Sequence, residues 1–138
     1  MMSSLALFLS LSASTLPAVD CDWPRSGSDN ITCARVAADS ADADLQQAFK
    51  QLREIVDRHA SATVDFGPAS IEQIESVLSS FDDAQSKWAA FRTAECQAVA
   101  KFMVGNDHDS VTQFQCRAQL TIERSKYVRA LVAPFLGH

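Results

Sequence analysis

Four cysteines carry the most informative chemistry in this 138-residue chain: Cys21, Cys33, Cys96 and Cys116. An even number of cysteines behind an export-like N-terminus is typical of a disulfide-bonded protein of an oxidising compartment. If all four are bridged, none remains as the thiolate that nucleophilic catalysis requires. The cysteines therefore predict a stapled, extracytoplasmic protein.

The four cysteines can pair in three ways. Cys96 and Cys116 lie at similar distances from a polar turn at residues 105–109. An antiparallel helical hairpin about that turn would bring both to the same height, within the Cα separation of roughly 5 to 6 Å that a disulfide needs. The geometry therefore favours a Cys96–Cys116 bridge. Cys21 would then pair with Cys33, although the other two pairings stay open from sequence alone.

The remaining reactive side chains lack partners at the spacing of a known motif. His59 is interpreted as a helix C-terminal residue that the helix dipole favours, and His138 ends the chain. Asp107, His108 and Asp109 could offer three metal ligands, but adjacent turn residues seldom converge on one ion. We predict no catalytic residue, no metal site and no cofactor, and therefore no enzyme.

One segment carries an unusual polar stripe. Residues at three- and four-residue steps fall on one side of a helix. In this segment the residues that share such a side are Gln85, Trp88, Arg92, Glu95 and Cys96. Trp and Arg are over-represented in binding hot spots, but a stripe that leads into a bridged cysteine favours a semi-buried structural network. We expect Arg92 to meet a carboxylate such as Asp42, with Trp88 packed beneath it. Arg124 is likewise interpreted as part of a structural network.

The N-terminus has the features of an export signal. Residues 1–18 carry no charged side chain, and the apolar run at 5–11 is too short to span a bilayer. We predict cleavage after Ala18, a single domain over residues 19–138, a periplasmic or secreted location and no membrane anchor. The formal net charge of -5 and the lack of a basic stripe argue against nucleic acid as a partner.

Three segments have helical periodicity and none alternates like a strand. We predict helices over 32–59, 69–104 and 110–133, and the acidic pair at 82–83 leaves open whether the second one bends. Their expected buried stripes are Leu45, Ala48, Phe49, Leu52, Ile55 and Val56; Ile71, Ile74, Val77, Leu78, Phe81, Ala84, Trp88, Phe91, Val99 and Phe102; and Val111, Phe114, Ala118, Thr121, Ile122, Ser125, Val128 and Val132. The predicted fold is all-α, an antiparallel bundle of three main helices plus a short N-terminal segment.

Local signals mark the ends of these helices. Ser28 and Asp29 are candidate caps for the first helix. Ser70 and Gln73 have the spacing of a capping box for the second. Gly105 suits the left-handed position just after a helix ends.

Three runs of sequence carry a family resemblance. CARVAADSADADLQQAFKQL, AQSKWAAFRTAEC and QCRAQLTIER resemble the lysozyme inhibitor LprI-like family, over nearly the whole chain after residue 18. The matching positions are Cys33, Ala34, Ala41, Asp42, Leu45, Ala84, Gln85, Trp88, Phe91, Arg92, Cys96, Cys116, Leu120, Thr121 and Arg124. Gln46 and Phe49 stand where the family usually has Asn and Tyr. The resemblance implies an exported bacterial helical protein, and we interpret the shared residues as mainly structural.

The family's named activity implies a protein partner, a peptidoglycan-degrading enzyme of the lysozyme kind. Lysozymes are commonly basic, so a chain with a charge of -5 would be steered toward one. The turn formed by Gly105, Asn106, Asp107, His108 and Asp109 is a candidate contact. Two alternatives remain: a periplasmic immunity protein against a type VI secreted amidase or muramidase toxin, and an envelope structural or stress protein without an enzyme target.

Overall fold

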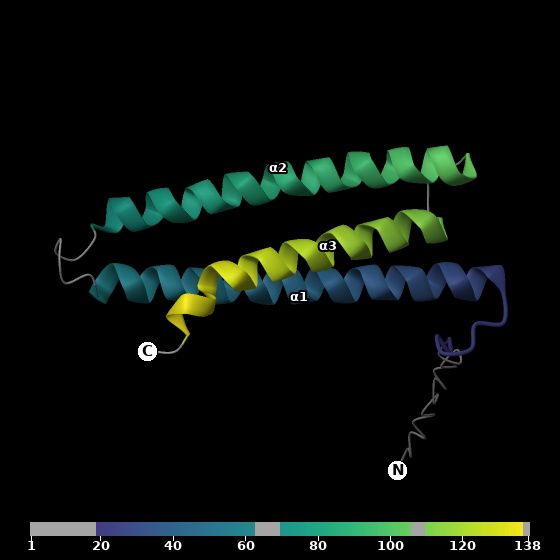
Figure 1. Cartoon of the computed structure of the whole chain (residues 1–138), viewed down its shortest axis with the longest axis horizontal. Helices are drawn as coiled ribbons and strands as arrows, with labels where there is room; N and C mark the ends of the chain where they lie inside the picture. The colour runs from purple at the N-terminus through teal and green to yellow at the C-terminus, as the bar shows by residue number, and fades with distance from the viewer. Residues whose placement is uncertain (1–18, 63–69, 106–109, 137–138) are drawn as a thin grey trace, which may run out of the picture.

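The computed structural model describes residues 19–62, 70–105 and 110–136. The elements are α1 (Gly27–Ala62), α2 (Ile71–Val104), α3 (Val111–Val132) and a one-turn 3-10 helix, η1 (Ala133–Phe135). Consecutive helices run antiparallel, and α3 lies between the other two near its start and crosses over α1 toward its end (Figure 1). The predicted all-α bundle is confirmed. The expected signal peptide lies outside the described residues.

The first helix begins five residues earlier than predicted, and a different side chain caps it. The Asp29 backbone N–H donates to the Ser26 hydroxyl over 3.0 Å, so Ser26 occupies the capping position. The predicted caps, Ser28 and Asp29, instead lie inside the first turn. Asp29 is still useful there, because a carboxylate is favourable at the positive end of the helix dipole.

The caps of α2 are confirmed. The Gln73 backbone N–H donates to the Ser70 hydroxyl (3.3 Å), and the Ser70 N–H donates to the Gln73 side chain (2.8 Å). At the other end Gly105 has a φ of 69°, a left-handed conformation that glycine adopts without strain, and its N–H donates to the carbonyl of Lys101. The helix runs unbroken through the acidic pair at 82–83.

The core lies mainly between α1 and α3, which pack along each other far more extensively than either packs on α2. Its larger cluster consists of Leu45, Ala48, Leu52, Ile55, Val128 and Val132, and a smaller one of Ala34, Ala38 and Phe114. The small side chains of Ala38 and Ala48, which are at most 1% exposed, let the two helices approach closely. The predicted stripes of the first and third helices therefore face each other.

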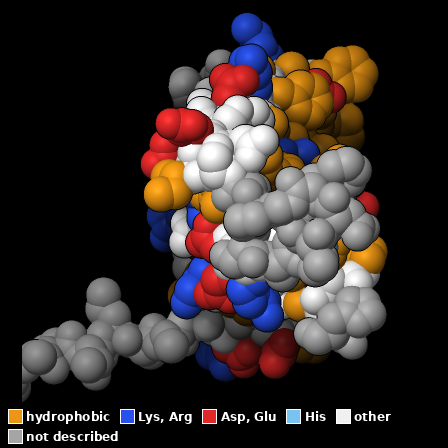
Figure 2. Space-filling model, turned by 90° about the vertical axis from the view of Figure 1, so that its left-hand side faces the viewer, with side chains coloured by type: hydrophobic (Ala, Val, Ile, Leu, Met, Phe, Trp, Pro, Cys, Tyr) orange, Lys and Arg blue, Asp and Glu red, His pale blue; other side chains and the backbone are white. Residues whose placement is uncertain are grey.

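By contrast, α2 is peripheral, and only Cys96 and Ala100 of this helix are buried. The predicted buried stripe is wrong for several residues that the structure exposes: Ile71 (74%), Val77 (44%), Ala84, Phe91 (54%) and Phe102 (87%), as well as Ile122 (41%) of α3. Viewed toward one end of the molecule, hydrophobic side chains gather at the height of α2, in the upper right of Figure 2.

The spacing of the apolar residues explains the error at the C-terminal end of α2. They recur at Ile74, Phe81, Trp88 and Phe102 in steps of seven or fourteen. A straight helix turns once every 3.6 residues, so a seven-residue repeat drifts by about 20° per heptad. The stripe therefore starts half-buried against the bundle at Ile74 and ends on the outer surface at Phe102.

Candidate functional site

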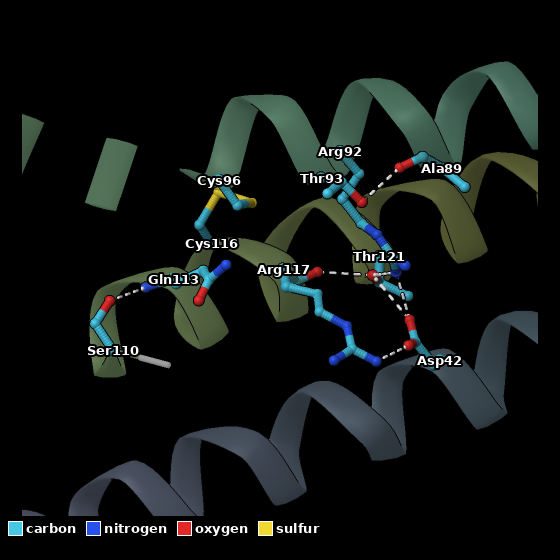
Figure 3. The surroundings of a disulfide bond; sticks show 10 residues. All are labelled: Asp42, Ala89, Arg92, Thr93, Cys96, Ser110, Gln113, Cys116, Arg117 and Thr121. Atoms are coloured by element: carbon cyan, nitrogen blue, oxygen red, sulfur yellow. Dashed lines mark hydrogen bonds and ion pairs between the residues drawn. A yellow bond between two sulfur atoms is a disulfide. The ribbon is translucent and has the colours of Figure 1, made fainter. Parts of the chain in front are cut away.

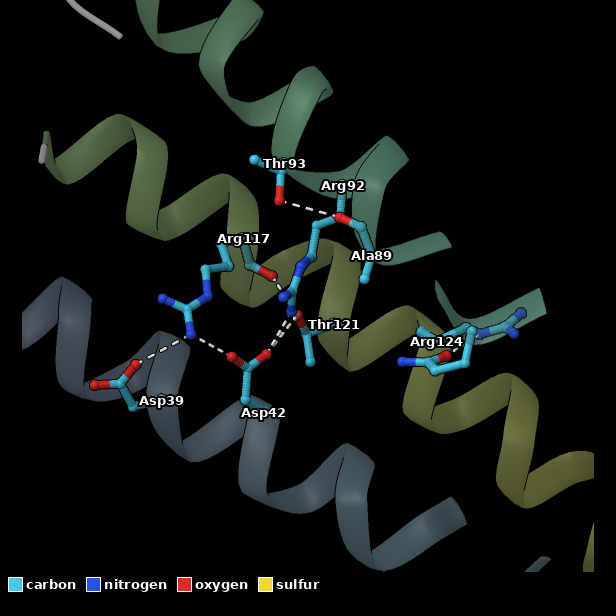
Figure 4. Close-up of polar contacts among 9 residues, drawn as sticks. Asp39, Asp42, Ala89, Arg92, Thr93, Arg117, Thr121 and Arg124 are labelled. Carbon is cyan, nitrogen blue, oxygen red and sulfur yellow. Dashed lines mark hydrogen bonds and ion pairs between the residues drawn. The ribbon is translucent and has the colours of Figure 1, made fainter. Parts of the chain in front are cut away.

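Polar side chains from all three helices meet beside the bundle core. Arg92 of α2 donates to the carboxylate of Asp42 on α1, and also donates to the Thr121 hydroxyl of α3 over 2.6 Å. The Thr121 hydroxyl in turn donates to the backbone carbonyl of Arg117, also over 2.6 Å. The Arg92–Asp42 contact expected from sequence is therefore present, and the threonine links it to α3 (Figure 4).

A second arginine completes this network, and the sequence reasoning missed it. Arg117 of α3 forms an ion pair with the other carboxylate oxygen of Asp42 and a longer one, 3.2 Å, with Asp39. The sequence signal that could have identified Arg117 and Asp39 is their spacing from residues of the network. Arg117 lies four positions before Thr121, and Asp39 lies three positions before Asp42, so each pair shares a helix face.

The two arginines set the charge state of Asp42. Burial is the largest influence and by itself raises the pKa of this carboxyl. The hydrogen bonds and positive charges of Arg117 and Arg92 together outweigh it and hold the pKa below its ordinary value. Asp42 therefore stays ionised and joins α1 to the other two helices.

A second layer of contacts centres on Arg124 of α3. This residue lies one helical turn beyond Thr121 and two turns beyond Arg117. Its Nε donates to the side-chain oxygen of Gln85 over 3.3 Å. Its guanidinium carbon lies 5.8 Å from the centre of the Trp88 ring and 5.5 Å from that of Tyr127. Arg92 covers Trp88 at 4.9 Å. Both arginines thus hold Trp88 by cation–π contact, which matches the expected packing of Trp88 beneath Arg92.

The positions that depart from the family pattern lie in this same region. Phe49, the aromatic ring without a hydroxyl, lies 5.9 Å from the guanidinium carbon of Arg124. Gln46 is exposed and lines a groove beside the network. One matching motif residue, Phe91, takes no part in either layer and points outward, since it is 54% exposed.

Both disulfides have the pairing favoured from sequence. Cys96–Cys116 joins α2 to α3 with a Cα separation of 5.5 Å, and Cys21–Cys33 ties the N-terminal segment to α1 with one of 5.4 Å. Figure 3 shows the first bridge beside the polar network, with Arg92 about one turn from Cys96 on the same helix. The motif thus combines a covalent link and a charged link between α2 and its neighbours.

Two of the grooves of the bundle differ in polarity. The first, about 430 Å³, runs between α1 and α2 next to Asp42, Trp88 and Arg92, and an Arg53–Asp82 ion pair bridges the same two helices. The second, about 410 Å³, is almost wholly apolar and lies where the C-terminal part of α1, the start of α2 and the end of α3 diverge. There His59, in the last turn of α1 as expected, packs edge-to-face on Phe135 at 4.8 Å between ring centres.

The polar contacts and the Cys96–Cys116 disulfide described above join the three helices to one another. All four cysteines are bridged. Across 19–62, 70–105 and 110–136, no group of three or more metal-ligating side chains is placed to hold an ion. None of the helices in these ranges is both long and apolar enough to cross a membrane. Of the candidate contact turn, Gly105 is described, whereas 106–109 lie outside the described residues, as does His138.

The fold and the motif define a class: a small all-α protein stapled by two disulfides, with an arginine–aspartate network joining its helices. A family model, lysozyme inhibitor LprI, matches residues 21–127. The chain belongs to this family. Comparison with curated proteins and with solved structures gives no match.

Proposed function

We propose that this protein is an exported inhibitor of a peptidoglycan-degrading enzyme of the lysozyme type. The observation that carries the proposal is the family match, which covers residues 21–127. The two disulfides support a site of action in an oxidising compartment. A net charge of -5 supports a basic target, because complementary charge speeds encounter.

The mechanism is steric occlusion by a preorganised surface. Binding costs less when the contact surface is already ordered, and the Cys96–Cys116 bridge fixes the end of α2 to the start of α3. The turn at residues 105–109 is the proposed contact with the enzyme's cleft. Gly105 allows the chain to leave α2 sharply at a φ of 69°. Two acidic residues, Asp107 and Asp109, follow it in sequence.

An inhibition assay tests the proposal directly. The full chain is expressed with its own N-terminus in a secreting bacterial host and purified with both disulfides intact. We expect the recovered protein to begin at Val19 and to inhibit at least one lysozyme class at micromolar concentration. Inhibition should weaken as salt is raised from 0.05 to about 0.5 M, because exposed charges are then screened. No inhibition of any lysozyme class would overturn the proposal.

A matched pair of charge reversals tests the contact. Asp107→Lys and Glu75→Lys change the net charge equally, but Glu75 is an exposed residue near the start of α2, at the opposite end of the bundle. If the turn touches the enzyme, Asp107→Lys should weaken inhibition at least tenfold more than Glu75→Lys. Equal effects would show that charge acts only at long range and that the contact lies elsewhere.

The same purified protein separates the lysozyme proposal from the immunity alternative. Inhibition of a peptidoglycan amidase without inhibition of any lysozyme would assign the protein to toxin neutralisation. Inhibition of lysozyme alone would support the proposal as stated.

A further inference from the structure

A continuous heptad pattern runs along α2, half-buried at its start and exposed at its end. In coiled-coil notation the first core position of each heptad is a and the fourth is d. The a positions are Ile74, Phe81, Trp88, Glu95 and Phe102, and the d positions are Val77, Ala84, Phe91 and Ala98. Such a repeat over about four heptads is the pattern by which one α-helix packs on another. Only Glu95 interrupts its apolar character.

In the C-terminal part of this pattern Trp88 packs against the bundle, whereas most of the other apolar residues face outward. Phe91 is 54% exposed and Phe102 is 87% exposed, and both alanines of the d series in this part, Ala84 and Ala98, are exposed. The buried residues Cys96 and Ala100 lie on a different face of the same helix. We call the outward stripe from Ala84 to Phe102 the α2 seam. Its 18-residue span corresponds to about 27 Å of helix.

The order of large and small side chains in the α2 seam is complementary to itself when reversed. In an antiparallel pair of helices, each a position faces a d position of the other helix. A two-fold axis at residue 93 gives three facing pairs: Ala84 with Phe102, Trp88 with Ala98, and Phe91 with Glu95. Each pair occurs twice across a two-fold axis. Bulky rings thus meet alanines, or the aliphatic stem of the glutamate, which is how large and small residues interdigitate in a packed interface.

We propose that the α2 seam binds a second copy of this chain, with the two α2 helices antiparallel about residue 93. The available area fits a weak dimer. With about 200 Å² for a phenylalanine side chain, Phe91 and Phe102 together offer roughly 280 Å² per copy. This is about a third of the roughly 800 Å² per partner that a standard stable interface buries. The half-buried Trp88 and the exposed Ala84 and Ala98 add to this area.

The α2 seam ends at Phe102, so the proposed dimer contacts do not include residues 105–109. Dimerisation is therefore compatible with the proposed enzyme contact but does not depend on it.

The first experiment is sedimentation equilibrium of the full disulfide-bonded chain at rising concentration. We expect a mass that approaches twice that of the monomer, and Phe102→Glu should weaken association at least 100-fold. Val36→Glu is the matched control, because Val36 is similarly exposed (55%) but lies on α1, away from the seam. Circular dichroism checks that each variant remains helical. A monomer at every concentration up to about 1 mM would overturn the proposal, as would an equal effect of Val36→Glu.

The second experiment tests the register. Ala84→Phe places two rings opposite each other and Phe102→Ala leaves two small side chains opposite, so each single variant should weaken association at least tenfold. The double variant exchanges large and small within one facing pair and should restore association to within about threefold. A double variant no better than the singles would exclude the antiparallel register. Loss of enzyme inhibition by Phe102→Glu with no change in mass would instead assign the seam to the enzyme.

Discussion

The interface between α1 and α3 differs in kind from the interface that holds α2. The first has a closely packed apolar core, with Leu45, Val128 and Val132 at most 4% exposed, and ion pairs of Arg117 and Arg129 with α1 lie along its border. The second depends on polar contacts of Arg92 and Arg124 and on one disulfide, and it contains only two fully buried residues of α2. The family motif is concentrated in this second interface.

The difference explains why the motif has these residue types. Hydrophobic burial is non-directional, so an apolar interface requires only volume and pattern. A peripheral helix with little buried area needs directional contacts to fix its height and rotation. Ion pairs that are hydrogen-bonded and partly buried give such geometric specificity, and a disulfide restricts the unfolded chain as well. The motif therefore specifies how α2 is docked.

The largest expected effect comes from breaking the apolar interface. Leu45→Ala should lower the free energy of unfolding by about 4 kcal/mol, because it removes a fully packed side chain and leaves a cavity. Leu78→Ala, at a half-buried site on α2, should cost less than half as much. Urea denaturation followed by circular dichroism measures both. Equal costs would show that α2 is packed as tightly as α1 and α3.

Removal of the Cys96–Cys116 bridge should have the next largest effect. The double variant Cys96→Ala with Cys116→Ala should lose about 3 kcal/mol, the loop-closure value for a 20-residue separation. Removal of Cys21–Cys33 in the same way is the control, since that bridge does not touch α2. Limited proteolysis should cut α2 faster only in the first variant. Similar cleavage of α2 in both would contradict a specific role for Cys96–Cys116.

Loss of one arginine of the network should have an intermediate effect. Arg92→Gln should cost about 2 kcal/mol, because it removes charge-assisted hydrogen bonds to Asp42 and Thr121 in a partly buried site. Arg129→Gln removes an ion pair with Asp44 in which both side chains are nearly half exposed, and should cost under about 1 kcal/mol. Thermal and urea unfolding of both variants gives the comparison, and the reverse order would refute it.

The smallest expected effect is on the pH dependence of stability. The pKa of Asp42 is lowered in the folded protein, and so is that of Asp44, mainly through its hydrogen bond from Arg129. A carboxyl with a depressed folded-state pKa contributes stability above its unfolded pKa, near the ordinary aspartate value of 3.8, and loses it as the pH falls through the folded value. Stability should therefore decline below about pH 4. Asp42→Asn should make that decline shallower, as urea unfolding from pH 2 to 7 would show, whereas an unchanged slope would argue against the assigned shift.

Much of the fold could be predicted from the sequence because helical periodicity and caps act locally. The stripe of Leu45, Leu52 and Ile55 matched the buried face of α1, and the box of Ser70 and Gln73 marked the start of α2. The cysteine pairing followed from the symmetry of a helical hairpin. These features depend on residues close together in the chain or related by one turn.

The errors arose where tertiary context decides. Phe91 and Phe102 have the spacing of a buried stripe, but the sequence does not show that the bundle lies on one side of α2 and that the heptad repeat drifts away from it. Arg117 was missed because its partners, Asp39 and Asp42, lie 78 and 75 positions away. The Arg92–Asp42 contact was expected only because the polar stripe required a carboxylate.

Hydrogen exchange, measured amide by amide, tests most directly whether α2 is fastened separately to a core made by α1 and α3. The measurement compares the native protein with the double variant that lacks Cys96–Cys116. In the native protein we expect the slowest exchange in the central turns of α1 and α3, and faster exchange in α2. In the variant, α2 should lose most of its protection while the centres of α1 and α3 keep theirs. Loss of protection in all three helices together would contradict this description.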